Sequence, residues 1–441
     1  MSDRRSVLLV IGAGSRKDRD SRPYRERLPA GAAREYPPWP LETDEPTRQA
    51  PYAAGSGIVS ERATEALVAA AREVAGRHDV IGAPCPDEAL LPPAARVAAD
   101  PGPPGASVEA VRTCRDEEPG RRPLTEADLP QPRHTAAESA GGPRAVAGEC
   151  GYPVALKPPG PEASSGVIEA EGPDRADTAS AVAVAADRPG VERYPGTVAG
   201  ELPGGPETGV GGSVVDGRHE PYAVARERGG SPPRSVGTGH MVGADAPVLT
   251  APLIRGLPDI PALTAPLARG LPERAHKALG FGHGMTHAEA KPTPRGPVVE
   301  SNGRPGGGPV PRPGRPAAGV DLGRAAARVA AGVRPPVPPA SADAPHGGPR
   351  TVGIRLRDPT GDLAVTGIEP PRPGDHPGLI EAVPLVAVGA EPRRPPAGHV
   401  SRSAHPTAEG ADTGERSARL GAPGSAVTVH GRPPTGGAPA I

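Results

Sequence analysis

The pattern of apolar and polar positions near the start of the chain predicts alternating strands and helices. Ser6–Ile11 is a run of aliphatic residues, SVLLVI, followed by the glycine turn Gly12–Gly14, as is typical of a buried strand in a parallel sheet. Ser60–Gly76 places Ala, Leu and Val at helical spacing between a Ser that can cap a helix and a Gly that can end it. Asp79–Ala83 has the pattern of the next strand, and Leu90–Ala99 that of a second helix. This alternation, over about the first 110 residues, predicts an α/β domain with a parallel sheet.

The middle of the chain has the pattern of antiparallel strands. Val210–Val215 and Pro221–Arg226 are joined by Asp216-Gly217, a dipeptide that favours the tight type I′ turn of a β-hairpin. Tyr152–Lys157 and Pro297–Glu300 are predicted as further strands. The hairpin is the most specific of these expectations, because a two-residue turn fixes which residues pair.

After Pro309 a helix is followed by short strands. Val320–Gly332, VDLGRAAARVAAG, has Ala and Val at helical spacing. Beyond a Pro-rich linker, strands are predicted over Thr351–Leu356, Leu363–Ile368 and Ile380–Val388. The end of the chain, after about residue 402, is expected to be mobile.

Composition complicates this picture, because proline and glycine are abundant. The 441 residues include 65 Pro and 61 Gly but only one Phe and one Trp. Such a bias approaches that of disordered chains and leaves few large aromatic core residues. It also fits a GC-rich genome, whose codons favour Ala, Gly, Pro and Arg without selection for disorder. A partly disordered chain therefore stays an open alternative.

Charge and cysteine content exclude several classes of function. The net charge of −1 gives no overall field that attracts nucleic acid or an anionic membrane. The three cysteines, at positions 85, 114 and 150, form no CxxC pair and no disulfide framework. No stretch has the length of a membrane span or the pattern of a signal peptide. These features predict a protein of the reducing cytoplasm.

The stretch HAEAKPTPRGPVVESNGRPGGG, residues 287–308, holds the strongest candidate chemistry. It contains Glu289, Glu300, Arg304 and Asn302, the only asparagine in the chain. A predicted turn separates the two glutamates, so they are expected to lie across neighbouring antiparallel strands. Facing carboxylates repel unless a cation lies between them, and oxygen donors suit Mg²⁺. On spacing alone, two solvated surface glutamates remain the alternative.

Two further segments are weaker candidates for binding phosphate. Lys157 ends an apolar strand, and its ammonium could hold a phosphate as a point charge, although an ordinary strand-end lysine is the favoured interpretation from this residue alone. The loop 158–166 could close over phosphates through its backbone N–H groups. The turn Gly12–Gly14 lacks a third glycine at dinucleotide-motif spacing and is interpreted as a plain strand–helix turn. His240 could face a substrate, although a surface histidine is the favoured interpretation. The pair His283 and His287 lacks the HExxH pattern of a zinc site.

Taken in order, these segments resemble the ATP-grasp carboxylate–amine ligases, particularly the L-amino-acid ligase-like group. GYPVALKPPG resembles the strand with the nucleotide-binding lysine, GELPGGPETGV the hinge beside the nucleotide, and HAEAKPTPRGPVVESNGRPGGG the metal-binding signature. EAVPLVAVGAEPRRPPAGHVSRSAH resembles the C-terminal domain of that group, and the resemblance covers roughly residues 6 to 405. The implied fold is α/β, with α+β character in the ATP-grasp part. It comprises a Rossmann-like parallel-sheet domain at 1–112, an ATP-grasp domain at 113–310, a small C-terminal α+β domain at 311–405 and a flexible tail at 406–441.

The resemblance implies an ATP-dependent reaction that joins a carboxylate to an amine through an acyl phosphate. Glu289, Glu300 and Asn302 would then bind Mg²⁺ or Mn²⁺, and Arg304 would stabilise the transferring phosphoryl group. Lys157 would contact the ATP phosphates, and Glu201 would lie at the nucleotide hinge. The implied partners are small carboxylate and amine substrates, with amino acids the first choice. Neither nucleic acid nor membrane is expected, and a homodimer is an allowed assembly.

Several departures from the family pattern support a degenerate homologue as the alternative. Glu117 stands where the family has a nucleotide-contacting lysine, Gly211 replaces an acidic residue, and the lid PPGPEASSG is rich in proline and carries Glu162. The spacing between the two metal-site glutamates is one residue short, which predicts a β-bulge if both are to face one metal. Prolines in YPPWPLETD, at the expected second strand, are predicted to remove a ladder hydrogen bond.

Overall fold

The computed structural model describes most of the chain. The described residues are 4–14, 26–100, 102–137, 142–157, 167–185, 197–203, 207–228, 239–242, 270–293, 295–306, 320–336, 351–392 and 402–434. The chain divides into two compact units, each built from three separate stretches of sequence. Unit 1 comprises Met1–Gln131, Gly204–Ala225 and Asp245–Ala342, and unit 2 comprises Pro132–Pro203, Arg226–Ala244 and Asp343–Ile441.

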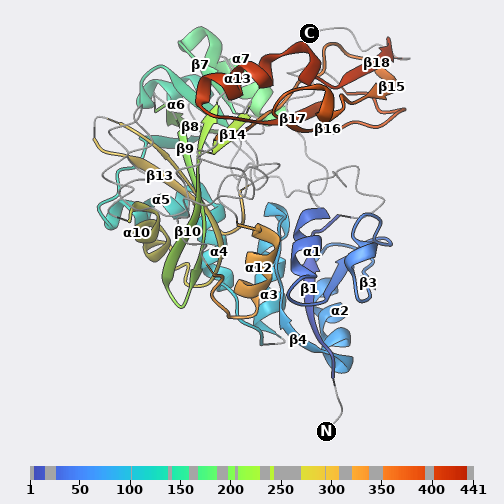
Figure 1. The fold of residues 1–441 in the computed structure, drawn as a ribbon. Coiled ribbons are helices and arrows are strands. Elements are labelled where there is room, and N and C mark those ends of the chain that lie inside the picture. Colours follow the sequence, from blue (N-terminus) through green and yellow to red (C-terminus); the bar gives the residue numbers. More distant parts are fainter. Residues whose placement is uncertain are drawn as a thin grey trace. The chain divides into compact units, whose positions relative to one another are not determined.

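Unit 1 begins with a four-stranded parallel sheet of order β3-β2-β1-β4 and the helices of the same stretch of chain (Figure 1). The strands are β1 (Ser6–Ile11), β2 (Pro38–Glu42), β3 (Gly57–Ile58) and β4 (Asp79–Gly82). The helices are α1 (Arg27–Ala32), α2 (Thr64–Arg77), α3 (Leu91–Ala99), α4 (Val108–Arg115) and α5 (Glu117–Glu126). The side chains of 7–11 are fully buried, which explains why β1 is continuously apolar in sequence. The α/β fold class and the first predicted strands and helices are confirmed, but α2 begins at Thr64 after Ala63, so the predicted serine cap is wrong.

Strand β2 tolerates its prolines because of the direction in which their nitrogens point. The N–H of Leu8 donates to the carbonyl of Pro37 at 3.0 Å, and the N–H of Ala54 donates to the carbonyl of Pro38 at 2.8 Å. Successive residues of a strand face alternate neighbours, so Pro38 and Pro40 direct their nitrogens away from β1. Strand β3 pairs with β2 only from Leu41 onward. The predicted loss of a ladder hydrogen bond is therefore wrong for this strand.

A second sheet contributes the strands β13-β12-β9-β10 to unit 1. They are β9 (Glu207–Val215), β10 (Arg218–Arg228, through residue 225 in this unit), β12 (Gly284–Lys291) and β13 (Val298–Asn302). The β9–β10 turn has positive φ at both Asp216 (53°) and Gly217 (75°), which confirms the predicted type I′ hairpin. Helices α10 (Leu271–Ala278) and α12 (Leu322–Ala330) complete the unit.

Helix α12 packs against α1 at a crossing made by two glycines. A Cβ on Gly323 would lie 2.6 Å from the carbonyl oxygen of Arg27, and one on Gly31 would lie 2.8 Å from the backbone nitrogen of Arg324. Only glycine permits backbones to approach so closely. Helix α12 also contributes Ala327 to a buried cluster with Leu8 of β1. The predicted helix over 320–332 is confirmed, and it completes the packing of the first sheet.

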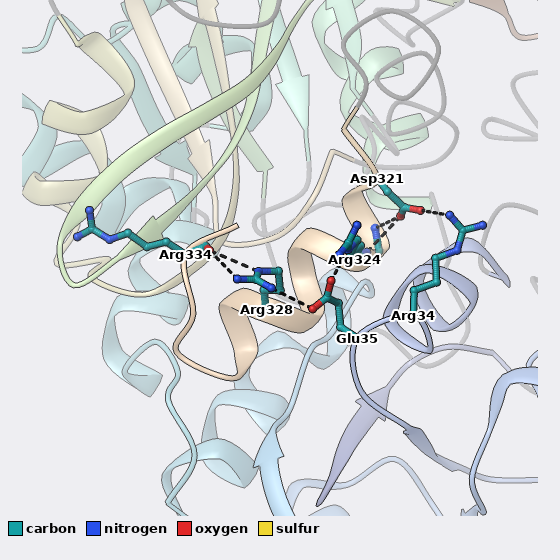
Figure 2. Close-up of polar contacts among 7 residues, drawn as sticks. Arg34, Glu35, Asp321, Arg324, Arg328 and Arg334 are labelled. Atoms are coloured by element: carbon teal, nitrogen blue, oxygen red, sulfur yellow. Dashed lines mark hydrogen bonds and ion pairs between the residues drawn. The ribbon is translucent and has the colours of Figure 1, made fainter. Parts of the chain in front are cut away.

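Ion pairs surround this crossing, as Figure 2 shows. Glu35 accepts from Arg324 and, at 3.0 Å, from Arg328, while Asp321 lies 3.4 Å from Arg34. Asp321 also caps α12 by accepting from the backbone N–H groups of residues 323 and 324, each at 3.1 Å. We call Arg34, Glu35, Asp321, Arg324 and Arg328 the α1–α12 clasp.

Unit 2 contains a four-stranded antiparallel sheet of order β5-β8-β6-β7. Its strands are β5 (His134–Ala137), β6 (Val154–Lys157), β7 (Ile168–Ala170) and β8 (Thr197–Glu201). Helices α6 (Gly142–Cys150) and α7 (Pro173–Ala185) pack on it, and their alanines form one core cluster with Val154 and Leu156. The alternation of buried and half-buried residues along β6 is that of a sheet covered mainly on one face.

The remaining strands of unit 2 have the order β11-β14-β17-β16, with a separate β15–β18 pair. They are β11 (Gly239–Val242), β14 (Thr351–Arg355), β15 (Ala364–Glu369), β16 (Leu379–Pro384), β17 (Ala404–Gly410) and β18 (Thr428–Arg432), with helix α13 (Thr413–Gly421). Residues 406–434 thus form regular structure where a flexible tail was expected. Asp412 caps α13 by accepting from the N–H of Glu415 at 2.8 Å, and Leu420 is buried. Within the described ranges, no helix is long and apolar enough to cross a bilayer.

Candidate functional site

Strands β12 and β13 bring the two predicted metal-binding glutamates together. Glu289 and Glu300 are directly opposite partners in the antiparallel register. Directly paired residues project from the same face of a sheet, so both carboxylates lie on one face. The predicted placement on neighbouring antiparallel strands is confirmed. The predicted bulge is wrong, because the register runs without interruption from His287 paired with Asn302 to Lys291 paired with Val298.

Asn302 and His287 extend this group along the same face. Each lies two residues from a glutamate, and the two are directly paired across the strands. Glu300 is exposed, whereas Asn302 and His287 are buried. We call Glu289, Glu300, Asn302 and His287 the carboxylate corner.

The charge of Glu289 is set by its neighbours. Burial alone would raise the pKa of Glu289, but the hydrogen bond and charge of His287, the charge of Arg304 and a hydrogen bond with Glu207 lower it to about 2. His287 Nε2 lies 3.1 Å from Glu289 Oε1. The carboxyl group is therefore an anion at neutral pH, as a metal ligand must be.

The donor set of the carboxylate corner fits a hard cation. Two carboxylates and one amide oxygen on one face are ligands of the kind that Mg²⁺ takes, with water and phosphate completing its coordination. Within the described part of the chain, no group of three or more His, Cys, Asp or Glu side chains is placed to hold a metal ion. The protein ligands proposed are accordingly two glutamates and Asn302.

The side chain of Arg304 forms an ion pair with a carboxylate outside the carboxylate corner. Its Nε contacts the carboxylate of Glu88, which lies in the short 3₁₀ helix η3 (Glu88–Leu90), and its Nη1 donates to the Pro305 carbonyl at 3.0 Å. Arg115 Nε also lies 3.6 Å from Glu88. The guanidinium expected to stabilise a phosphoryl group is thus held by a carboxylate in this arrangement, and its catalytic role stays a prediction.

The two predicted nucleotide contacts, Lys157 and Glu201, lie in unit 2. Val154 pairs with Glu201 and Lys157 with Val198, so the side chains of Lys157 and Glu201 project from opposite faces of the sheet. Glu201 accepts from the backbone N–H of Arg133 at 3.1 Å. These positions do not bring the two side chains together. The lid residues 158–166, including Glu162, lie outside the described residues.

Sequence reasoning missed the contact between His287 and Glu289. It treated His287 only as one half of a pair with His283, whose Nε2 instead lies 2.7 Å from the Val329 carbonyl oxygen. The signal was present as strand alternation, because residues two apart in a strand share a face. The Arg304–Glu88 contact had no such signal, since 216 residues separate its partners.

Comparison with known protein structures identifies the fold of the chain. No family model and no curated protein matches the sequence. Among solved structures, the chain is similar to L-amino acid ligase from Bacillus licheniformis, with a TM-score of 0.72 at 16% identity over 98% of this chain and 100% of that one. The chain has the ATP-grasp fold. This fold was implied by the sequence resemblance and is confirmed.

Other structures with the ATP-grasp fold show the same likeness. Phosphoribosylglycinamide synthetase from Anaerococcus prevotii has a TM-score of 0.67 at 13% identity, over 97% of this chain and 100% of that one. Biotin carboxylase from Campylobacter jejuni, solved as a β,γ-ATP complex, has a TM-score of 0.63 at 15% identity, over 96% and 92%. Sequence identity this low establishes the fold alone, so the activity must be argued from the residues.

Proposed function

We propose that the protein is an ATP-dependent carboxylate–amine ligase that forms an amide or peptide bond, with amino acids as the favoured substrates. The observation that carries the proposal is the direct pairing of Glu289 with Glu300, with Asn302 on the same face. These residues would hold Mg²⁺ or Mn²⁺, which supplies positive charge to ATP phosphates. The similarity in fold to L-amino acid ligase supports the same reaction class.

In the proposed reaction, a substrate carboxylate oxygen bonds to the γ-phosphorus of ATP while the bond to ADP breaks. The amine nitrogen then bonds to the acyl carbon, phosphate leaves, and the amine loses a proton. Lys157 would contact the ATP phosphates and Glu201 the nucleoside part, while Arg304 would stabilise phosphoryl charge. These roles require positioning and electrostatic stabilisation rather than a covalent enzyme intermediate. The substrates are small molecules, and a homodimer is the proposed assembly.

A thermal-shift titration with ATP and Mg²⁺ tests folding and binding together. A ligand that binds only the folded state raises the melting temperature with concentration. We expect ATP with Mg²⁺ to stabilise the chain, and Glu300→Gln to weaken this effect. Folded protein that shows no ATP hydrolysis across an amino-acid panel, with Mg²⁺ or Mn²⁺ present, would contradict ligase activity.

A second candidate is a degenerate ATP-grasp protein that binds nucleotide without catalysis. The contact of Arg304 with Glu88 favours it, because this guanidinium already has a carboxylate partner. The replacement of the family's lysine by Glu117 acts in the same direction. Glu117→Lys should raise ATP affinity if the scaffold is intact, and Glu88→Gln should release Arg304. If neither variant gains ATP affinity or hydrolysis, this account of the defect is wrong.

A further inference from the structure

His287 is the residue of the carboxylate corner to which the proposed function gives no role. Its side chain is only 2% exposed, while the neighbouring Glu289 side chain is 27% exposed. His287 Nε2 lies 3.1 Å from Glu289 Oε1, within hydrogen-bond distance. The residue is therefore anchored in the sheet and contacts a carboxylate that remains accessible.

The contact restricts the orientation of Glu289. A glutamate side chain has three rotatable bonds, and an unrestrained carboxylate on a strand can adopt several rotamers. The hydrogen bond from His287 to Oε1 restricts the rotation of the carboxylate, and a hydrogen bond with Glu207 restricts it further. Because Glu300 lies directly opposite Glu289, the restrained carboxylate is held on the face that its partner occupies.

The position of His287 in the register strengthens this argument. His287 is paired with Asn302 across the strands, so it is adjacent to two of the three proposed metal ligands. Gly211 of β9 is its partner on the other side, and a Cβ there would have no atom within 4 Å. The glycine leaves space beside His287, while Glu289 itself pairs with Gly209 and also has a hydrogen bond with Glu207 of β9.

We propose that His287 is a positioning residue, which orients Glu289 for metal binding without being a ligand itself. This inference rests on the proposed function, since it assigns a supporting role within the same site. Ligating carboxylates are commonly held by hydrogen bonds from a surrounding residue, and loss of such a partner weakens metal affinity about ten- to a hundredfold.

Two isosteric amides separate positioning from simple filling of space. The amide nitrogen of Gln reaches the place of imidazole Nε2, whereas that of Asn reaches only the place of Nδ1. His287→Gln should therefore keep the hydrogen bond to Glu289, and His287→Asn should lose it. His283→Gln is the matched control, because His283 contacts the Val329 carbonyl oxygen and no residue of the carboxylate corner.

The measurement is Mn²⁺ binding to the full chain by electron paramagnetic resonance, with and without ATP. We expect His287→Asn to weaken binding about ten- to a hundredfold, while His287→Gln and His283→Gln remain within about threefold of the unchanged protein. Circular dichroism melts establish that each variant is folded, and His287→Phe provides a second variant without a donor.

Equal Mn²⁺ affinity in the folded Asn, Phe and unchanged proteins would overturn the positioning role while leaving the proposed function intact. Equal losses in the Gln and Asn variants would also overturn it, because packing rather than the hydrogen bond would then be responsible. Absence of Mn²⁺ binding by the unchanged, folded protein would instead reject the proposed metal site, and this inference with it.

Discussion

Two polar clusters of unit 1, the α1–α12 clasp and a pair of histidine rings at α10, differ in whether charged groups are paired. In the α1–α12 clasp, Glu35 contacts Arg324 and Arg328, and Asp321 contacts Arg34, so each carboxylate has a cationic partner (Figure 2). At α10, the ring of His276 instead contacts that of His219, with the two rings tilted by 30° and their centroids 5.0 Å apart. Among the described residues, Nε2 of His219 has no hydrogen-bond partner, and the ring of His276 has only a backbone contact with Pro272. The clasp stabilises charges, whereas the histidine pair must stay uncharged.

Burial explains why the pair is sensitive to pH. Desolvation lowers the pKa of His219 to about 4, and desolvation together with the charge of His219 lowers that of His276 to about 3. The charged residues of α10, Glu273, Arg274 and Lys277, are exposed and therefore screened by water. Phe281 is the other ring beside His276, at 6.0 Å. A backbone hydrogen bond with Pro272 raises the pKa of His276, but desolvation and the charge of His219 outweigh it.

The largest expected effect is acid destabilisation of unit 1. In the unfolded chain the two histidines titrate near pH 6.5, whereas in the folded protein they stay neutral to lower pH. The free energy of unfolding is therefore highest above pH 6.5 and falls as the pH drops toward 4. By pH 4 the loss is roughly 6 kcal/mol for the two groups, at about 1.4 kcal/mol per pH unit for each proton. Urea unfolding followed by Trp39, the only tryptophan, measures this dependence.

Replacing one histidine of the pair measures how much of the acid destabilisation the pair causes. His276→Phe keeps a ring and removes one of the two titrating groups, so the fall in stability between pH 6.5 and 4 should become about half as steep. His430→Gln, at an exposed position of unit 2, should leave the slope unchanged. An unchanged slope in His276→Phe would show that other groups govern acid unfolding.

The next largest effect is expected at the crossing of α1 and α12, where two glycines let the backbones approach. Gly323→Ala places a methyl group 2.6 Å from the Arg27 carbonyl oxygen and 2.8 Å from that of Leu28, and neither backbone atom can move easily. We expect a loss of about 3 kcal/mol in the free energy of unfolding. Gly76→Ala in α2 is the control, because nothing lies within 4 Å of its Cβ, and it should stabilise by up to about 1 kcal/mol.

A smaller effect is expected from the clasp's ion pairs. Glu35→Gln leaves Arg324 and Arg328 without their carboxylate and should cost about 1–2 kcal/mol at neutral pH. The hydrogen bond from Arg324 lowers the pKa of Glu35, so this contribution is present above the carboxyl group's ordinary pKa and is lost in acid. Glu126→Gln, whose partner Arg122 is exposed like itself, should change stability by less than about 0.5 kcal/mol. Equal losses in both variants would contradict a special role for the clasp.

The smallest effect compares two neighbouring glycines of β9. Gly211→Ala meets open space and should stabilise the strand by about 0.5–1 kcal/mol. Gly212→Ala would place its Cβ 2.5 Å from the Glu220 carbonyl oxygen and 2.8 Å from His219 Nε2, and should destabilise. If the histidine pair is packed against β9, chemical denaturation will show an increase in the free energy of unfolding for Gly211→Ala and a decrease for Gly212→Ala.

Short stretches of sequence predicted individual strands and turns, but not which segments they would pair with. Asp216-Gly217 specifies its own turn, and β1 is apolar because both faces are covered, so each was predictable from adjacent residues. The pairing of Glu289 with Glu300 depended on the connecting loop, whose length cannot reveal register. The prolines of β2 were misjudged because their cost depends on which neighbour each nitrogen faces.

Contacts between distant segments had no local signal. His219 and His276 are separated by a long stretch of chain, and neither lies in a motif. Arg304 and Glu88 likewise combine two ordinary charged positions. Residue type gave the metal-site expectation, since Asn302 is unique in the chain, but only the fold shows which side chains surround it.

The packing of α12 on α1 also bears on synthesis at the ribosome. Roughly 290 residues separate the two helices, so at about 5–20 residues per second the first sheet waits roughly 15–60 s for its covering helix. During that interval the surface that later receives Ala327, including Leu8 and Ala32, lacks its partner. The nascent chain therefore presents an apolar surface to chaperones until its residue 330 has emerged.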